Sequence, residues 1–105
     1  MITDAMLDTF LAKAQDVVDR DYDKFMPQPR VVNGPTLSIE KGKRYAKIVA
    51  TDDNGLGRRV WGFIDMTNGE VLKAASWKAP AKNFPRGNLN DASGGVGRAQ
   101  WMGIY

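Results

Sequence analysis

The sequence predicts an α+β fold in which one N-terminal helix packs on a three- to four-stranded antiparallel meander sheet. Two observations lead to this prediction. Apolar residues recur at helical spacing over residues 4–26, and strand-like segments separated by turn residues follow from residue 37 to residue 77. The 105 residues can build one domain with one modest core, so we expect a single domain over residues 1–105.

The first element is an amphipathic helix over residues 4–26. Thr3 can cap its N-terminus, because a threonine hydroxyl accepts a hydrogen bond from a free backbone N–H of the first turn. Pro27 and Pro29 end the helix, and a proline-rich linker over residues 27–36 leads to the sheet. The helix presents one apolar stripe, made of Met6, Leu7, Phe10, Leu11, Ala14, Val17, Val18, Tyr22 and Phe25.

The sheet is expected to consist of three main strands and one short edge strand. The main strands are Arg44–Thr51, Arg58–Met66 and Glu70–Trp77, and the edge strand is Leu37–Ile39. Asn68-Gly69 favours a two-residue hairpin turn, because both residues tolerate a positive φ angle.

This turn, together with a pairing of Thr51 with Arg58, sets a strand register in which Ile48 faces Trp61. In that register one face of the sheet packs on the helix. It comprises Ala46, Ile48, Ala50, Trp61, Phe63, Leu72 and Ala74. The other face is open and comprises Tyr45, Lys47, Val49, Val60, Ile64, Lys73, Ala75 and Trp77.

The segment from residue 78 to residue 105 is basic and rich in glycine. Lys78–Asn88 alternates prolines with basic residues and is expected to run over the surface. Arg98–Tyr105 can either return as a last strand or dock as a hydrophobic end.

Charge is distributed unevenly along the chain. Residues 1–29 contain six acidic and three basic residues, whereas residues 30–105 contain twelve basic and six acidic residues. A basic body behind an acidic helix can attract polyanions.

Composition argues against an enzyme, a metal site and a cofactor. The chain has no cysteine and no histidine, which removes thiolate ligands, the commonest metal ligand and the commonest general base. Asp65, Glu70 and Asp91 are not expected to converge as the carboxylates of a metal-dependent nuclease do. No apolar run reaches the roughly 20 residues that cross a bilayer, and the N-terminus does not resemble a signal peptide. We therefore expect a cytoplasmic protein that does not enter membranes.

The open face and the segment after it combine aromatic and basic side chains. Aromatic rings stack on bases and cations neutralise phosphates, which is the combination that single-strand-binding proteins use. The sequence therefore predicts non-catalytic binding of nucleic acid, with single strands favoured and either DNA or RNA as the polymer. The predicted binding residues are Tyr45, Lys47, Lys73, Trp77, Lys78, Lys82 and Arg86.

Two other functions fit the same residues. The protein can bind a host or viral protein, or a second copy of itself, through apolar side chains of the open face (Val49, Val60, Ile64, Trp77) and through Trp101–Tyr105. It can also hold a small anionic nucleotide in a pocket formed by the aromatic and basic residues.

Four segments resemble a family of small tailed-phage proteins of about this length. Residues 73–82 read KAASWKAPAK and residues 86–88 read RGN, and the segments Arg44–Val49 and Gly62–Asp65 are also similar. The resemblance covers roughly residues 36–105, and it departs from the family pattern at Asn83-Phe84-Pro85. It implies a phage origin and a setting in the host cell cytoplasm during infection, and it implies no particular chemistry.

Overall fold

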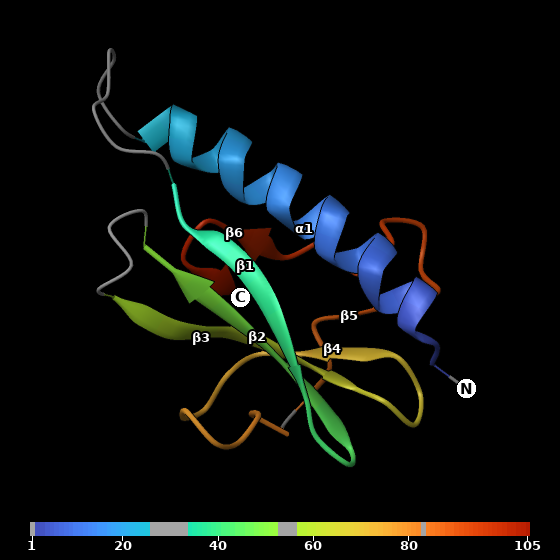
Figure 1. Ribbon diagram of the computed structural model, residues 1–105. Helices are drawn as coiled ribbons and strands as arrows, with labels where there is room; N and C mark the ends of the chain where they lie inside the picture. The colour runs from blue at the N-terminus through green and yellow to red at the C-terminus, as the bar shows by residue number, and fades with distance from the viewer. Residues whose placement is uncertain (1, 26–33, 53–56, 83) are drawn as a thin grey trace.

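The computed structural model describes residues 2–25, 34–52, 57–82 and 84–105. One helix, α1 (Asp4–Phe25), lies across one side of a five-stranded antiparallel sheet of order β1-β2-β3-β4-β5 (Figure 1). The α+β prediction is confirmed, with five strands where three or four were expected. The strands are β1 (Thr36–Lys41), β2 (Tyr45–Thr51), β3 (Arg58–Asp65), β4 (Glu70–Leu72) and β5 (Gly87–Asn88), and a separate hairpin pairs β6 (Ala99–Gln100) with β7 (Gly103–Ile104).

Helix α1 begins as the sequence predicts. The Thr3 hydroxyl accepts a hydrogen bond from the backbone N–H of Met6 at 3.2 Å, which is the expected N-cap. Its predicted end at residue 26 and the linker residues 27–33 lie outside the described residues. The side chain of Gln15 fixes the helix to the start of β1: its Nε2 donates to the Pro35 carbonyl at 3.0 Å, and its Oε1 accepts from the Leu37 N–H at 2.7 Å.

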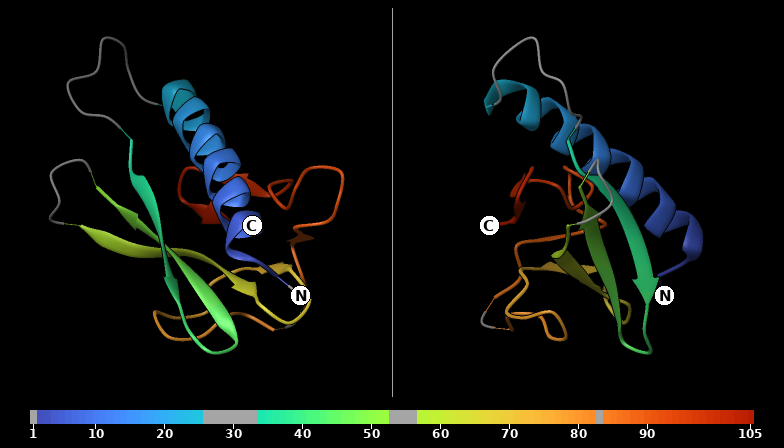
Figure 2. Two further views of the ribbon diagram at one scale, coloured as in Figure 1. Left: turned by 45° about the vertical axis from the view of Figure 1, so that its right-hand side comes forward. Right: turned by 60° about the vertical axis from the view of Figure 1, so that its left-hand side comes forward.

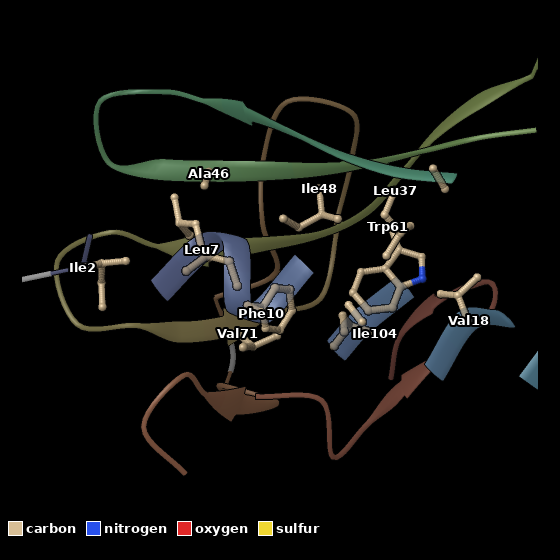
Figure 3. Close-up of a cluster of buried hydrophobic side chains, with 13 residues drawn as sticks. Ile2, Leu7, Phe10, Val18, Leu37, Ala46, Ile48, Trp61, Val71 and Ile104 are labelled. Atoms are coloured by element: carbon tan, nitrogen blue, oxygen red, sulfur yellow. The ribbon is translucent and has the colours of Figure 1, made fainter. Parts of the chain in front are cut away.

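The core lies between α1, the sheet and the C-terminal hairpin (Figure 3). Trp61 is its largest side chain; the ring stands edge-on to Phe10, with 6.4 Å between ring centroids, and Nε1 donates to the Gln100 carbonyl at 2.9 Å. Ile104 is 3% exposed and belongs to the same cluster. The hydrophobic end of the chain therefore both pairs as a hairpin and docks in the core.

A β-bulge in β3 changes the register between β2 and β3. Thr51 pairs with Arg58 as predicted, but Ile48 pairs with Gly62 and not with Trp61. Trp61 is the extra residue; its indole still fills the helix side of the sheet. Every later residue of β3 therefore faces the side opposite to the predicted one.

The faces predicted beyond the bulge are consequently wrong. Phe63 and Leu72 were expected to face the helix. Phe63 on β3 instead pairs with Leu72 on β4 and with Lys47 on β2, so all three side chains lie on the open side. Ile64 was expected on the open side, but it pairs with Val71 and both belong to the core.

The turn between β3 and β4 is longer than the two-residue turn expected at Asn68-Gly69. The backbone N–H of Gly69 donates to the Asp65 carbonyl at 2.8 Å, and Gly69 has a φ angle of 79°. The Asp65 carboxylate accepts hydrogen bonds from the N–H and hydroxyl of Thr67, at 2.9 and 2.6 Å. These bonds close the turn at Asp65. The two strands therefore pair at Ile64 and Val71, whereas the two-residue turn would have paired Thr67 with Glu70.

Strand β4 ends at Leu72, whereas the sequence predicts a strand to Trp77. The chain after Leu72 bonds to itself: Ala81 N–H donates to the Lys73 carbonyl at 2.7 Å and Ala75 N–H to the Ala79 carbonyl at 3.0 Å. This closed loop keeps residues 73–82 off the edge of the sheet. In Figure 2, the loop of residues 74–82 and α1 lie on opposite sides of the sheet.

Within the described residues, no helix has both the length and the apolar character needed to span a membrane.

Close packing around Gly62 gives a test of the bulge. A Cβ atom added there would lie 2.8 Å from Ile104 Cγ1 and 3.3 Å from the Leu72 carbonyl oxygen. We expect Gly62→Ala to lower the free energy of unfolding in urea by about 1–3 kcal/mol. Ile104→Ala should cost less in the Gly62→Ala background than alone, because it relieves the clash. Additive effects of the two substitutions would contradict this packing.

Asp91 gives a second test. Its carboxylate accepts hydrogen bonds from the Ser93 hydroxyl at 2.7 Å, from the Asn88 N–H at 3.0 Å and from the Gly95 N–H at 2.9 Å. These bonds lower the pKa of Asp91 from 3.8 to about 2. A lowered pKa in the folded state stabilises the fold above about pH 4, and this contribution is lost as pH falls toward about 2.

The melting temperature of the wild type should therefore exceed that of Asp91→Ala by a margin that shrinks as pH is lowered from about 5 to about 2. Asp8→Ala is the control, because the Asp8 side chain accepts no hydrogen bond within the described residues. A margin for Asp91→Ala that stays constant with pH would show that the carboxylate does not carry this stability.

Candidate nucleic-acid interface

The structure assembles part of the predicted site on the open side of the sheet, where residues 73–82 cross β2. The Lys47 ammonium lies 4.2 Å from the ring centroid of Trp77, and the Lys82 ammonium lies 5.6 Å from that of Tyr45. Tyr45 and Lys47 are two residues apart on β2 and so share a face, about 7 Å from each other. Four of the predicted residues therefore lie together.

Arg58 extends this arrangement, with its guanidinium 5.7 Å from the Trp77 ring centroid. Cations and aromatic rings then alternate across the open side, and we call this set the aromatic–cation row. The row consists of Lys82, Tyr45, Lys47, Trp77 and Arg58. Sequence reasoning missed Arg58, although its predicted pairing with Thr51, which faces the same side of β2 as Lys47, places it on the open side.

A hollow of about 330 Å³ opens beside the row, over the β1–β2 hairpin. The predicted residue Lys78 lines it together with Tyr45 and Lys47. Five of the nine lining residues are basic and one is acidic. The full lining is Glu40, Lys41, Gly42, Lys43, Arg44, Tyr45, Lys47, Phe63 and Lys78.

Asp65 is the buried acid of this region, with 3% exposure, and it holds Arg44 at 3.4 Å. Burial raises the pKa of the Asp65 carboxyl, but the hydrogen bonds from Thr67 and the charge and hydrogen bond of Arg44 outweigh burial, so its pKa is lowered. The carboxylate thus stays ionised and holds Arg44, whose guanidinium also lies 5.3 Å from the Tyr45 ring centroid. The side chain of Arg44 remains 61% exposed.

Glu40 is the exposed acid of the site. It lies opposite Lys47 across the β1–β2 pair, and its carboxylate contacts the Arg58 guanidinium at 2.6 Å. Four lysines of the row and the hollow form no ion pair within the described residues, so the field over this surface is positive. These lysines are Lys43, Lys47, Lys78 and Lys82.

Two predicted site residues, Lys73 and Arg86, lie away from the row. The bulge in β3 places Lys73 on the helix side of the sheet, where its ammonium lies 5.7 Å from the Tyr105 ring centroid. The Arg86 guanidinium lies 3.8 Å from the Phe84 ring centroid and donates to the Phe84 carbonyl at 2.7 Å.

Apolar residues of the open face also differ from their predicted role as a protein interface. Val49 and Ile64 have no exposed surface, so neither can contact a partner. Trp77 is 42% exposed and Met102 is 52% exposed. In the described parts of the chain, no three acidic side chains are grouped so that they could hold a metal ion.

Residues 2–105 match a family described as "Family of unknown function (DUF7717)". The chain belongs to this family. The match spans the helix, the sheet and the C-terminal hairpin, so the elements that build the row are all part of the family domain. No curated protein and no solved structure matches the chain.

Proposed function

We propose that this member of the family is a non-catalytic nucleic-acid-binding protein that holds a single strand against the open side of its sheet. The alternation of cations and aromatic rings in the aromatic–cation row carries the proposal. A single strand also alternates, with a phosphate and a base in each nucleotide. The phage resemblance supports a setting in the cytoplasm of an infected host.

The energies favour a base on Trp77 over the lysine that now lies there. A cation–π contact at an exposed site contributes about 0.5–1 kcal/mol, whereas stacking on an aromatic side chain contributes about 1–3 kcal/mol per base. A base that displaces the Lys47 ammonium from the ring also frees that ammonium for the adjoining phosphate. One exchange therefore gains both a stacking contact and an ionic contact.

Single strands fit the row better than duplexes do, because paired bases are stacked on one another and do not offer their faces. Every base has a π face, so we propose weak sequence preference. The acidic helix α1 lies on the opposite side of the sheet and repels phosphates, which confines binding to the open side.

We propose binding without chemistry because the acids near the row are committed to structural contacts. Asp65 is buried and held by Thr67 and Arg44, and Glu40 is paired with Arg58. Asp65 therefore lacks the freedom that a general base needs, and Glu40 belongs to no group of acids that could hold a metal ion within the described residues.

A small anionic nucleotide is the second candidate ligand. The hollow of about 330 Å³ has the volume of a small ligand site and is lined mainly by basic residues. Competition distinguishes the two ligands: a mononucleotide that displaces a bound oligonucleotide at equal nucleotide concentration would favour the nucleotide.

The first test is the anisotropy of a labelled single-stranded oligonucleotide as the salt concentration is varied. We expect Trp77→Ala to weaken binding about tenfold at every salt concentration, because it removes stacking. Lys47→Ala should weaken binding and lower the slope of log affinity against log salt by about 0.7, because it removes one phosphate contact.

Lys24→Ala is the matched control, because it removes the same charge from the exposed end of α1. Equal effects of Lys24→Ala and Lys47→Ala would show that only net charge matters. Absence of oligonucleotide binding at low salt would overturn the proposed function.

A second prediction concerns Glu40, whose removal should strengthen binding. Glu40→Gln abolishes a negative charge beside Lys47 and releases Arg58 from its ion pair. We expect a several-fold higher affinity and a salt slope that is steeper by about 0.7, measured in the same assay. Asp16→Asn, which breaks an exposed ion pair with Arg20 on α1, is the control and should leave the affinity unchanged. Unchanged or weaker binding by Glu40→Gln would place the nucleic acid elsewhere.

A further inference from the structure

A second group of aromatic and basic side chains lies between residues 84–86 and the C-terminal hairpin. Phe84 is 47% exposed, and the guanidiniums of Arg86 and Arg98 lie 3.8 and 5.8 Å from its ring centroid. Tyr105 is 45% exposed; its main-chain oxygen accepts a hydrogen bond from Arg98 Nη1 at 3.2 Å, and the Lys73 ammonium lies 5.7 Å from its ring centroid. We call these five residues the edge cluster.

The edge cluster begins where the aromatic–cation row ends. Lys82 is the last residue of the row, and Phe84 follows two residues later, so their Cα atoms are at most about 7 Å apart. Residues 73–82 and 84–86 supply side chains to both groups.

The part of the chain that supplies the edge cluster is poor in acidic residues. From residue 71 onward the sequence contains one acid, Asp91. Its carboxylate is committed to the N–H groups and the hydroxyl of its own loop. Neither Lys73 nor Arg98 forms an ion pair within the described residues. The sequence that follows Lys82 therefore keeps an excess of basic over acidic residues.

We infer that a bound single strand continues beyond Lys82 onto the edge cluster and turns around the β4–β5 edge of the sheet. This inference rests on the proposed function and specifies its ligand as a strand long enough to reach both groups. Phe84 and Tyr105 supply stacking surfaces, and Lys73, Arg86 and Arg98 supply phosphate contacts. A flexible single strand can follow this turn, whereas a duplex, with a persistence length of about 150 base pairs, cannot.

Oligothymidylates of increasing length, from about 4 to about 16 nucleotides, provide the test in the anisotropy assay. The wild type should gain at least about tenfold in affinity between the shortest and the longest strands, because additional bases and phosphates reach the edge cluster. The double variant Phe84→Ala, Arg98→Ala should bind the shortest strand as the wild type does and lose most of this gain.

Two further variants keep the test independent of folding. Lys73→Gln changes one charge of the edge cluster and should lower the salt slope by about 0.7 for the longest strand and leave it unchanged for the shortest. Phe25→Ala, Arg20→Ala removes the same side-chain types from the exposed surface of α1 and should keep the full gain.

A length gain that persists in Phe84→Ala, Arg98→Ala would overturn the inference and leave the proposed function in place. Failure of the wild type to bind any length would overturn both. Binding of duplex and single strand with equal affinity and equal length dependence would also overturn the inference, because a duplex cannot follow the turn.

Discussion

The placement of Trp61 is the constraint on which the rest of the structure depends. Its indole fills the core against Phe10 and donates to the Gln100 carbonyl, so one side chain joins the helix, the sheet and the C-terminal hairpin. Trp61 occupies this position as the extra residue of a β-bulge, and the bulge decides which side of the sheet every later residue of β3 and β4 faces. Core packing at Trp61 thus determines which residues of β3 and β4 share the open side with Lys47, and it places Lys73 on the helix side.

The loop after β4 places Trp77 and Lys82 on the open side of the sheet. Backbone hydrogen bonds between Ala75 and Ala79 and between Lys73 and Ala81 close this loop on itself, and the closed loop holds Trp77 over Lys47. A ring that is already fixed by its neighbours loses little conformational freedom when a ligand stacks on it. Under the proposed function, the loop would therefore supply a stacking surface at a lower entropic cost than a free terminal segment.

Much of the fold follows from the sequence, and the errors have identifiable causes. Helix α1 and strand β2 have strong periodic patterns, so their positions and most of their inward-facing residues were predicted correctly. Phe25 is the exception: it was expected in the apolar stripe of the helix, but it is 66% exposed because the helix ends there beyond the reach of the sheet. Trp61, Phe63 and Ile64 are all apolar, so alternation could not reveal the bulge between them. The Asn68-Gly69 signal was overridden by the Asp65 side chain, whose bonds to Thr67 define a longer turn. One of these errors also affected the candidate site. The predicted residues on β2 and in the loop lie together, but the position of Lys73 depends on the register beyond the bulge and was predicted on the wrong side of the sheet.

Trp77 is the exposed ring of the aromatic–cation row, and a cation lies over it in the free protein. An exposed tryptophan beside a positive field is a site for non-specific association, and an ammonium over its face reduces the apolar surface offered to other proteins. The same ammonium is a poor competitor for the ring once a base is present, because the base stacks more strongly and brings a phosphate for the displaced charge. The Lys47 ammonium would then lie over the Trp77 ring in the free protein and contact a phosphate of the nucleic acid in the complex. A weak cation–π contact suits this exchange, because the free energy of a stronger contact would be subtracted from the binding free energy of the base.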